Sequence, residues 1–142
     1  MDNNNTNKPI KSFHDLEVYQ NTYQTMILVM REIIPKLPES EKYNLKDQLS
    51  RSCKAIPRLI AEGYAKRHQK FGFQKYLDDA MAECNETIVG LEQSKDLYRV
   101  NPELCDKFID IYDKSARQLF NLATAWYKFK DERRNPYTKR AS

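Results

Sequence analysis

The sequence predicts an all-α protein, most economically an antiparallel up-down-up-down four-helix bundle. Only three of its 142 residues are glycine, which argues against a turn-rich β protein. Four long segments carry apolar residues at steps of three and four, the period of an α-helix. Three short connections join these segments, so consecutive helices are expected to lie antiparallel and in contact.

The chain length of 142 residues indicates one domain that can bury a substantial core. We expect the bundle over residues 13–132, between a disordered N-terminal segment 1–12 and a basic flexible tail 133–142. The longest apolar run, residues 26–30, is far shorter than the roughly 20 residues of a membrane-spanning helix. The polar start of the chain has no signal-peptide core, so we expect a cytoplasmic protein without a membrane partner.

The first helix is predicted over residues 13–34, because Pro35 and Pro38 both disfavour its continuation. Its apolar residues form a broad face and a smaller second stripe. The broad face comprises Leu16, Tyr19, Tyr23, Met26, Ile27, Met30 and Ile34. The second stripe comprises Val18, Val29 and Ile33. Either both stripes belong to one wide buried surface, or the second stripe packs against a neighbouring subunit.

The second helix is predicted over residues 40–66, with Ser40 as its N-cap. Its apolar seam consists of Leu45, Leu49, Cys53, Ile56, Ile60 and Gly63. Pro57 lies inside this helix, where it removes a backbone amide at a cost of about 3 kcal/mol, so we expect a kink that the fold must compensate. Gly63 would allow close approach of another backbone, or it could weaken the helix near its end.

The third and fourth helices are predicted over residues 73–98 and 101–132. The third has an apolar seam of Phe73, Leu77, Ala80, Cys84, Ile88, Leu91 and Tyr98. Its acidic residues Asp78, Asp79, Glu83, Glu86 and Glu92 are expected to be solvated or paired with the basic helix.

The fourth helix starts at the cap sequence Asn101-Pro102-Glu103, where the proline suits the first helical position and the acid the first turn. One face of this helix carries Leu104, Phe108, Ile111, Ser115, Leu119, Leu122, Trp126 and Phe129. A second stripe carries Ile109, Tyr112, Ala116, Phe120, Ala123 and Tyr127. So broad an apolar surface exceeds what one small bundle usually buries, which favours a homo-oligomer.

No residue pattern in the chain indicates catalysis. Cys53, Cys84 and Cys105 fall on apolar helical positions, where reduced thiols packed as small hydrophobes are a better interpretation than metal ligands. His14 and His68 have no sequence-level catalytic partner, and neither a Glu-x-x-His pair nor a phosphate-binding glycine loop occurs. We therefore expect a non-enzymatic protein without cofactor or metal.

The basic residues of the second helix are the candidate binding site. A net charge of +4 mildly favours an anionic partner. The candidate phosphate contacts are Arg51, Lys54, Arg58, Lys66, Arg67 and Lys70. The alternative is a salt-bridged solvent face, because Asp47 and Arg51, and likewise Arg58 and Glu62, are spaced i, i+4. Without a stacking motif or groove-reading helix, any RNA or DNA binding should show little sequence specificity.

Three segments of the chain resemble a known family. The run FHDLEVY at residues 13–19 is similar to a family opening F-x-D-L-x-V-W/Y, and residues 45–51 and 55–63 resemble its central L-x-x-Q-x-x-R…S-I-P-x-N-I-A-E-G signature. Phe73, Leu77, Ala80 and Glu86 fit the family's third helix. The family is that of the proteins encoded by intervening sequences of bacterial 23S ribosomal RNA, which includes relatives of the accessory proteins of diversity-generating retroelements.

The resemblance covers about residues 13–127 and has departures. Ala55 replaces the usual serine, Leu59 the usual asparagine, and Ala82-Glu83 the usual Gly-Ser of the third helix. It implies a bundle that assembles into a ring-shaped homo-oligomer, commonly a homopentamer, and possible nucleic-acid binding through basic surface. For the retroelement relatives it implies a reverse-transcriptase partner. The two function hypotheses are thus a nucleic-acid-binding oligomer and a scaffold that docks another protein.

Overall fold

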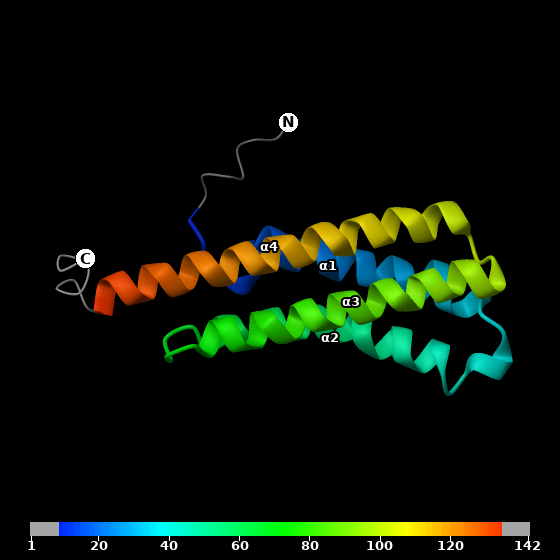
Figure 1. Ribbon diagram of the computed structural model, residues 1–142, viewed down its shortest axis with the longest axis horizontal. Coiled ribbons are helices and arrows are strands. Elements are labelled where there is room, and N and C mark those ends of the chain that lie inside the picture. Colours follow the sequence, from blue (N-terminus) through cyan, green and yellow to red (C-terminus); the bar gives the residue numbers. More distant parts are fainter. Residues whose placement is uncertain (1–8, 135–142) are drawn as a thin grey trace.

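The computed structural model of the chain describes residues 9–134, and the side chains of residues 9–128. It confirms an all-helical bundle, without a strand in the described part, built from α1 (Glu17–Leu28), α2 (Leu45–Ala65), α3 (Gly72–Tyr98) and α4 (Pro102–Arg134) (Figure 1). Because α2 packs against α1 and α3, and α4 packs against the same two helices, α2 and α4 occupy diagonal corners of the bundle. No described helix is long and apolar enough to cross a membrane.

The first predicted helix is interrupted near its start. A 3₁₀ turn, η2 (Phe13–Asp15), comes first, and Leu16 then leaves the helical conformation with φ −74° and ψ 124° before α1 begins. The cause is local capping: the Asp15 carboxylate accepts hydrogen bonds from the backbone amides of Lys11 (2.8 Å) and Ser12 (3.1 Å). The Ser12 hydroxyl in turn accepts from the amide of His14 at 3.1 Å, which completes a capping box. The prediction of one continuous helix from residue 13 was therefore wrong at this point.

The structure decides which apolar stripe of the first predicted helix faces the core. The second stripe, which one of the two predictions assigned to a subunit contact, is the one that faces inward. Val18, Val29 and Ile33 are buried within the bundle, so packing of this second stripe against a neighbouring subunit is excluded. Thr22 and Thr25 complete this inward stripe, and their hydroxyls donate to the carbonyls of Val18 and Asn21, both at 2.8 Å. The broad face is instead only partly covered. A π-helical turn, η3 (Val29–Ile33), followed by a 3₁₀ turn, η4 (Ile34–Lys36), ends the element.

Helix α2 begins five residues after the predicted N-cap. Ser40 lies in a 3₁₀ turn, η5 (Glu39–Glu41), and Asn44 is the residue that precedes α2. The carboxylate of Glu41 accepts the backbone amide of Leu45 at 3.1 Å and also the hydroxyl of Tyr98 at the end of α3. These two hydrogen bonds, the tyrosine's first, lower the pKa of Glu41. A carboxylate anchored from another helix thus caps α2 where the sequence suggested a serine.

Helices α2 and α3 approach each other closely because each contributes one glycine. A Cβ atom at Gly63 would lie 2.8 Å from the Cβ of Tyr76, and one at Gly90 would lie 2.9 Å from the Cδ1 of Leu49. Between these contacts the buried Thr87 hydroxyl donates to the Ser52 hydroxyl at 2.8 Å. The prediction that Gly63 permits close backbone approach is confirmed.

The three cysteines lie in the core, as their helical positions predicted. All are buried and free, and burial raises the pKa of Cys53 and of Cys84 to about 12. Tyr112 of α4 is also fully buried, yet its hydroxyl has no hydrogen-bond partner among the described residues. Burial, with a smaller effect of Cys53 and Cys84, raises the pKa of Tyr112 well above its usual value.

The ends of α3 and α4 agree closely with the predictions. Helix α3 starts one residue early, at Gly72, after Phe71 in the left-handed conformation with φ 60°. Helix α4 continues to Arg134, two residues past the predicted end, and the rest of the predicted tail lies outside the described residues. Most of the predicted N-terminal segment 1–12 lies outside them too.

Candidate nucleic-acid interface

Three of the six predicted site residues form one exposed face of α2. Arg51, Lys54 and Arg58 are spaced three and four residues apart, so their side chains leave the same side of the helix. We call them the α2 cationic face. The Arg51 guanidinium lies 3.4 Å from the Asp47 carboxylate, but its side chain is 79% exposed, so this pair contributes little stability. Lys54 and Arg58 have no ion pair within the described residues, and the predicted pair between Arg58 and Glu62 does not form.

A polar groove of about 560 Å³ runs between α2 and α3 beside this face. It is lined by Gln48, Arg51, Ser52, Lys54, Ala55, Arg58, Glu83 and Glu86. Burial, followed by a hydrogen bond with Glu86, raises the pKa of Glu83. Glu83 and Glu86 line the α3 side of the groove and the cations line the α2 side. No ion pair joins the two sides in the part of the chain that the structure describes.

A second groove, of about 300 Å³, runs along the other side of the α2 cationic face. We call it the aromatic groove; it is lined by Phe13, Tyr19, Tyr23, Met26, Lys54, Pro57, Arg58 and Ala61. Lys54 and Arg58 line both grooves, so they form the ridge between them. Sequence reasoning missed the aromatic groove because it assigned both tyrosines to a buried face. The sequence signal for it is the i, i+4 spacing of Tyr19 and Tyr23, which places the two rings side by side on one face of α1.

The other three predicted site residues lie in the connection between α2 and α3, where each contacts an aromatic side chain. We call Lys66, Arg67 and Lys70 the turn cluster. The Lys66 ammonium donates to the Tyr76 hydroxyl at 2.7 Å, and this hydrogen bond raises the pKa of Lys66. The Arg67 guanidinium lies 3.9 Å from the centre of the Tyr64 ring, and the Lys70 ammonium lies 5.3 Å from that of Phe71.

The six predicted residues therefore form two groups rather than one patch. Eight residues of helix separate Arg58 from Lys66, which is about 12 Å at 1.5 Å per residue. Phe71 keeps the left-handed conformation, which costs about 1–2 kcal/mol for a non-glycine residue. Its ring stacks on Tyr127 of α4 with centroids 5.5 Å apart and planes 13° apart. That stack joins the α2–α3 connection to the C-terminal part of α4, which lies at the same end of the bundle (Figure 1).

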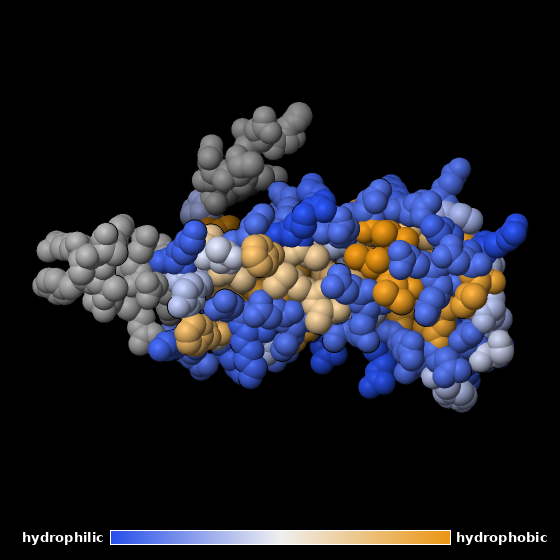
Figure 2. All heavy atoms as spheres, in the orientation of Figure 1, coloured by the Kyte–Doolittle hydropathy of each residue, from blue (hydrophilic) through white to orange (hydrophobic). Residues whose placement is uncertain are grey.

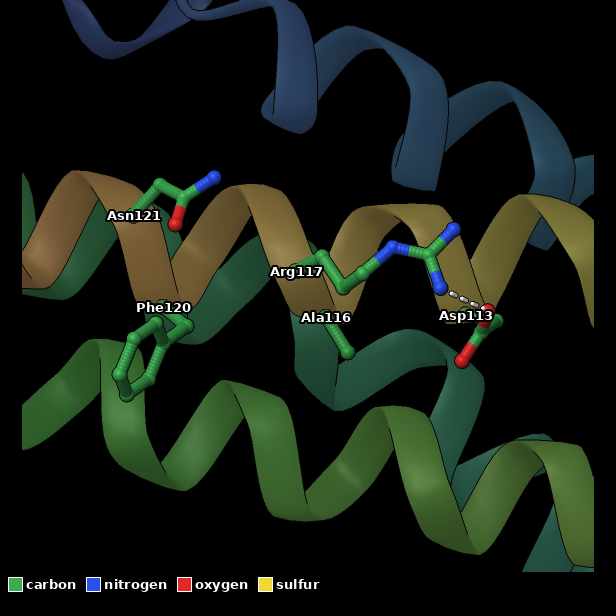
Figure 3. A pocket seen from close by; sticks show the side chains of 5 residues that line it. All are labelled: Asp113, Ala116, Arg117, Phe120 and Asn121. Carbon is green, nitrogen blue, oxygen red and sulfur yellow. Dashed lines mark hydrogen bonds and ion pairs between the residues drawn. The ribbon is translucent and has the colours of Figure 1, made fainter.

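Helices α3 and α4 present an apolar band on the face shown in Figure 2, where hydrophobic residues gather along the line between the two helices. Phe120 is 59% exposed and, with Ala116, lines a shallow depression of about 330 Å³. Figure 3 shows Phe120 pointing toward α3, with the ion pair of Arg117 and Asp113 further along α4. The second apolar stripe predicted for α4 is thus only partly buried. Tyr112 and Ala123 are core residues, whereas Phe120 and Tyr127 are exposed.

Comparison with known proteins identifies the family. The family model described as 23S rRNA-intervening sequence protein matches residues 14–121, a segment that includes α1, α2 and α3, most of α4 and all six predicted site residues. A search among curated proteins finds no match. Because the matched segment covers well over half of the chain, the protein belongs to the 23S rRNA-intervening sequence protein family.

Proposed function

We propose that this protein is a non-enzymatic bundle that binds RNA or DNA through the α2 cationic face and the turn cluster. The observation that carries the proposal is the ridge formed by Lys54 and Arg58, two exposed cations without an ion pair in the described residues. A phosphodiester backbone supplies the anion that such a ridge lacks. The family's name, which refers to an intervening sequence of 23S rRNA, is compatible with a nucleic-acid-related role.

The expected binding is weakly specific for sequence. Phosphate contacts fix the position of a protein on a nucleic acid but carry no sequence information. The turn cluster adds three cations whose aromatic contacts limit their freedom without removing their charge. Cys53 and Cys84 are not expected to act as catalytic nucleophiles, because a buried thiol with a pKa of about 12 is a poor nucleophile.

The salt dependence of binding tests this proposal. Labelled single-stranded RNA and duplex DNA would be titrated with the protein at several salt concentrations, using Lys54→Glu/Arg58→Glu and, separately, Lys66→Glu/Lys70→Glu. The matched control is Lys107→Glu/Lys114→Glu, which makes the same charge change at exposed positions on α4, diagonal to α2. For duplex DNA, log affinity falls as log salt rises, and each lost phosphate contact should make that slope shallower by about 0.9. Equal effects of the three variants, or no effect, would refute the assignment.

Self-association is the second part of the proposal. The exposed Phe120 and the surrounding apolar band support contact between copies, because a monomer gains by removing such a patch from water. Association would place several cationic ridges in one particle, so that weak phosphate contacts add. The resemblance implies a homopentamer, and light scattering would give the count. Phe120→Asp should lower the solution mass, whereas Tyr43→Asp, at a more exposed position in the connection before α2, should not.

A scaffold for another protein is the second candidate function, and the same apolar band favours it. The partner that the resemblance suggests is a reverse transcriptase. Co-purification of a reverse transcriptase with the parent protein after nuclease treatment, lost in Phe120→Asp, would support the scaffold. If nuclease treatment by itself abolished co-purification, the two proteins would be associated only through shared nucleic acid.

A further inference from the structure

The aromatic groove contains a continuous series of ring contacts. Phe13 and Tyr19 meet edge to face, with centroids 4.9 Å apart and planes at 78°. Tyr19 and Tyr23 then stack, with centroids 5.8 Å apart and planes at 29°. His14 stacks on Phe13 outside the groove lining, at 4.0 Å. Tyr23 ends the series and is 43% exposed, so part of its ring remains available to a ligand.

These rings are positioned before any ligand arrives. The capping box that holds η2 fixes the backbone of Phe13, and the Gln20 side-chain amide donates to the carbonyl of His14 at 2.8 Å. Across the groove, Pro57 is buried and cannot adjust its φ angle. A site whose walls are already ordered loses less conformational entropy when it binds. This arrangement gives Pro57 a role that the sequence left open, as a rigid part of the groove wall.

The two sides of the aromatic groove differ: one side is formed by aromatic rings, and the other carries two cationic side chains. Tyr19 and Tyr23 come from α1, whereas Lys54 and Arg58 come from α2 and lack an ion pair in the described residues. The groove surface itself is mainly apolar, and the exposed side chains of Lys54 and Arg58 border it, so an occupant with a flat apolar face and an anionic group matches both features. A nucleotide carries a flat base and an anionic phosphate separated by one sugar, so it can contact both walls at once.

We propose that the aromatic groove binds an unpaired base of a single-stranded nucleic acid. This proposal rests on the nucleic-acid binding proposed above. The base stacks against Tyr23 beside Tyr19, and the adjoining phosphates contact Lys54 and Arg58. Every base has a π-face, so such stacking tolerates any sequence. In a duplex each base is already stacked and paired, so a duplex engages the cations alone. The protein therefore prefers single strands to duplexes of the same sequence.

The experiment compares one oligonucleotide as a single strand and as a duplex. A non-self-complementary RNA of mixed sequence would carry one 2-aminopurine, whose fluorescence reports stacking on an aromatic ring. Tyr23→Leu should weaken single-strand binding by about tenfold and reverse the fluorescence quenching, while duplex binding stays unchanged. Tyr23→Phe keeps the ring and should behave like the parent. The control is Tyr43→Leu, which removes a ring that lies outside the groove and has Lys42 5.5 Å from its centre.

Several results would overturn the proposal. Equal affinities of the parent for single strand and duplex would do so, as would an equal loss in Tyr23→Leu and Tyr43→Leu. If Tyr23→Leu lowered the solution mass and left single-strand affinity unchanged, the groove would be an interface between copies.

Circular dichroism would establish that each variant is folded. Tyr19→Leu supplies an independent second position, for which the same loss of single-strand affinity is expected. Absence of binding to either form at low salt would refute the proposed function itself, whereas cation-dependent binding without a tyrosine effect would refute only this inference.

Discussion

Replacing Tyr112 with phenylalanine should make the protein more stable, although most core substitutions do the opposite. Tyr112 is fully buried in α4, and its hydroxyl has no hydrogen-bond partner among the described residues. Its neighbours include Cys53 and Cys84, whose thiols are weak hydrogen-bonding groups. In the unfolded chain the same hydroxyl is hydrated. Folding therefore removes a hydroxyl from water without replacing its hydrogen bonds.

The magnitude follows from the cost of an unsatisfied buried polar group, which is about 1–3 kcal/mol. Phenylalanine retains the ring and its packing, so only the hydroxyl is lost. A small void left by the missing oxygen offsets part of the gain. We expect the free energy of unfolding to rise by about 1 kcal/mol, which for a chain of 142 residues raises the melting temperature by about 4 °C.

The assay is urea and thermal unfolding followed by circular dichroism at 222 nm, the usual helix signal. Tyr98→Phe is the matched control, since it deletes the same atom from a hydroxyl that does donate a hydrogen bond, to Glu41. Tyr98→Phe should therefore lower stability while Tyr112→Phe raises it. A loss of about 1 kcal/mol in Tyr112→Phe would show that its hydroxyl has a partner in the folded protein, and the reasoning would be refuted.

Three further predictions concern the other contacts that hold the bundle together. Gly63→Ala should destabilise the protein by about 1–3 kcal/mol in urea unfolding, because the new methyl group meets the Cβ of Tyr76 and one helix must shift; unchanged stability would show that α2 and α3 can separate at no cost. The lowered pKa of Glu41 means that its hydrogen bonds stabilise the fold above the ordinary glutamate range, and that this stability is lost as pH falls through the folded-state pKa. The raised pKa of Tyr98 gives the complementary loss above about pH 10, so Tyr98→Phe should flatten both limbs of a stability–pH curve. Cys53, whose pKa is about 12, should not react with a thiol reagent at pH 8 until denaturant unfolds the chain, and rapid labelling of the native protein would contradict its burial.

The helices themselves could be predicted because their apolar seams are long and regular. In α2 and α3 the predicted seam residues Leu49, Ile56, Leu77 and Leu91 are all buried in the core. The first helix was harder, because two of its inward positions are threonines. A threonine hydroxyl reads as polar in the sequence, yet bonding to a carbonyl four residues earlier satisfies it and lets it pack inside, as Thr22 shows.

The candidate site was only partly predictable for a different reason. Spacing shows that Arg51, Lys54 and Arg58 share a helix face, but it does not show which charges find a partner. Asp47 and Arg51 pair at the predicted spacing whereas Arg58 and Glu62 do not. The aromatic groove depends on contact between α1 and α2, and on a break at Leu16 that places Phe13 beside it. Neither the contact nor the break has a periodic signature.

The diagonal placement of α2 and α4 has a genetic consequence. A substitution such as Phe120→Asp alters the corner of the bundle that lies farthest from Lys54 and Arg58. Single alleles should therefore separate subunit assembly from the phosphate contacts of each subunit. Phe120→Asp should lose assembly, and with it the added affinity of several ridges in one particle, but keep the contacts that Lys54 and Arg58 make. Such a pair of alleles would show in a living cell which of the two properties the host requires.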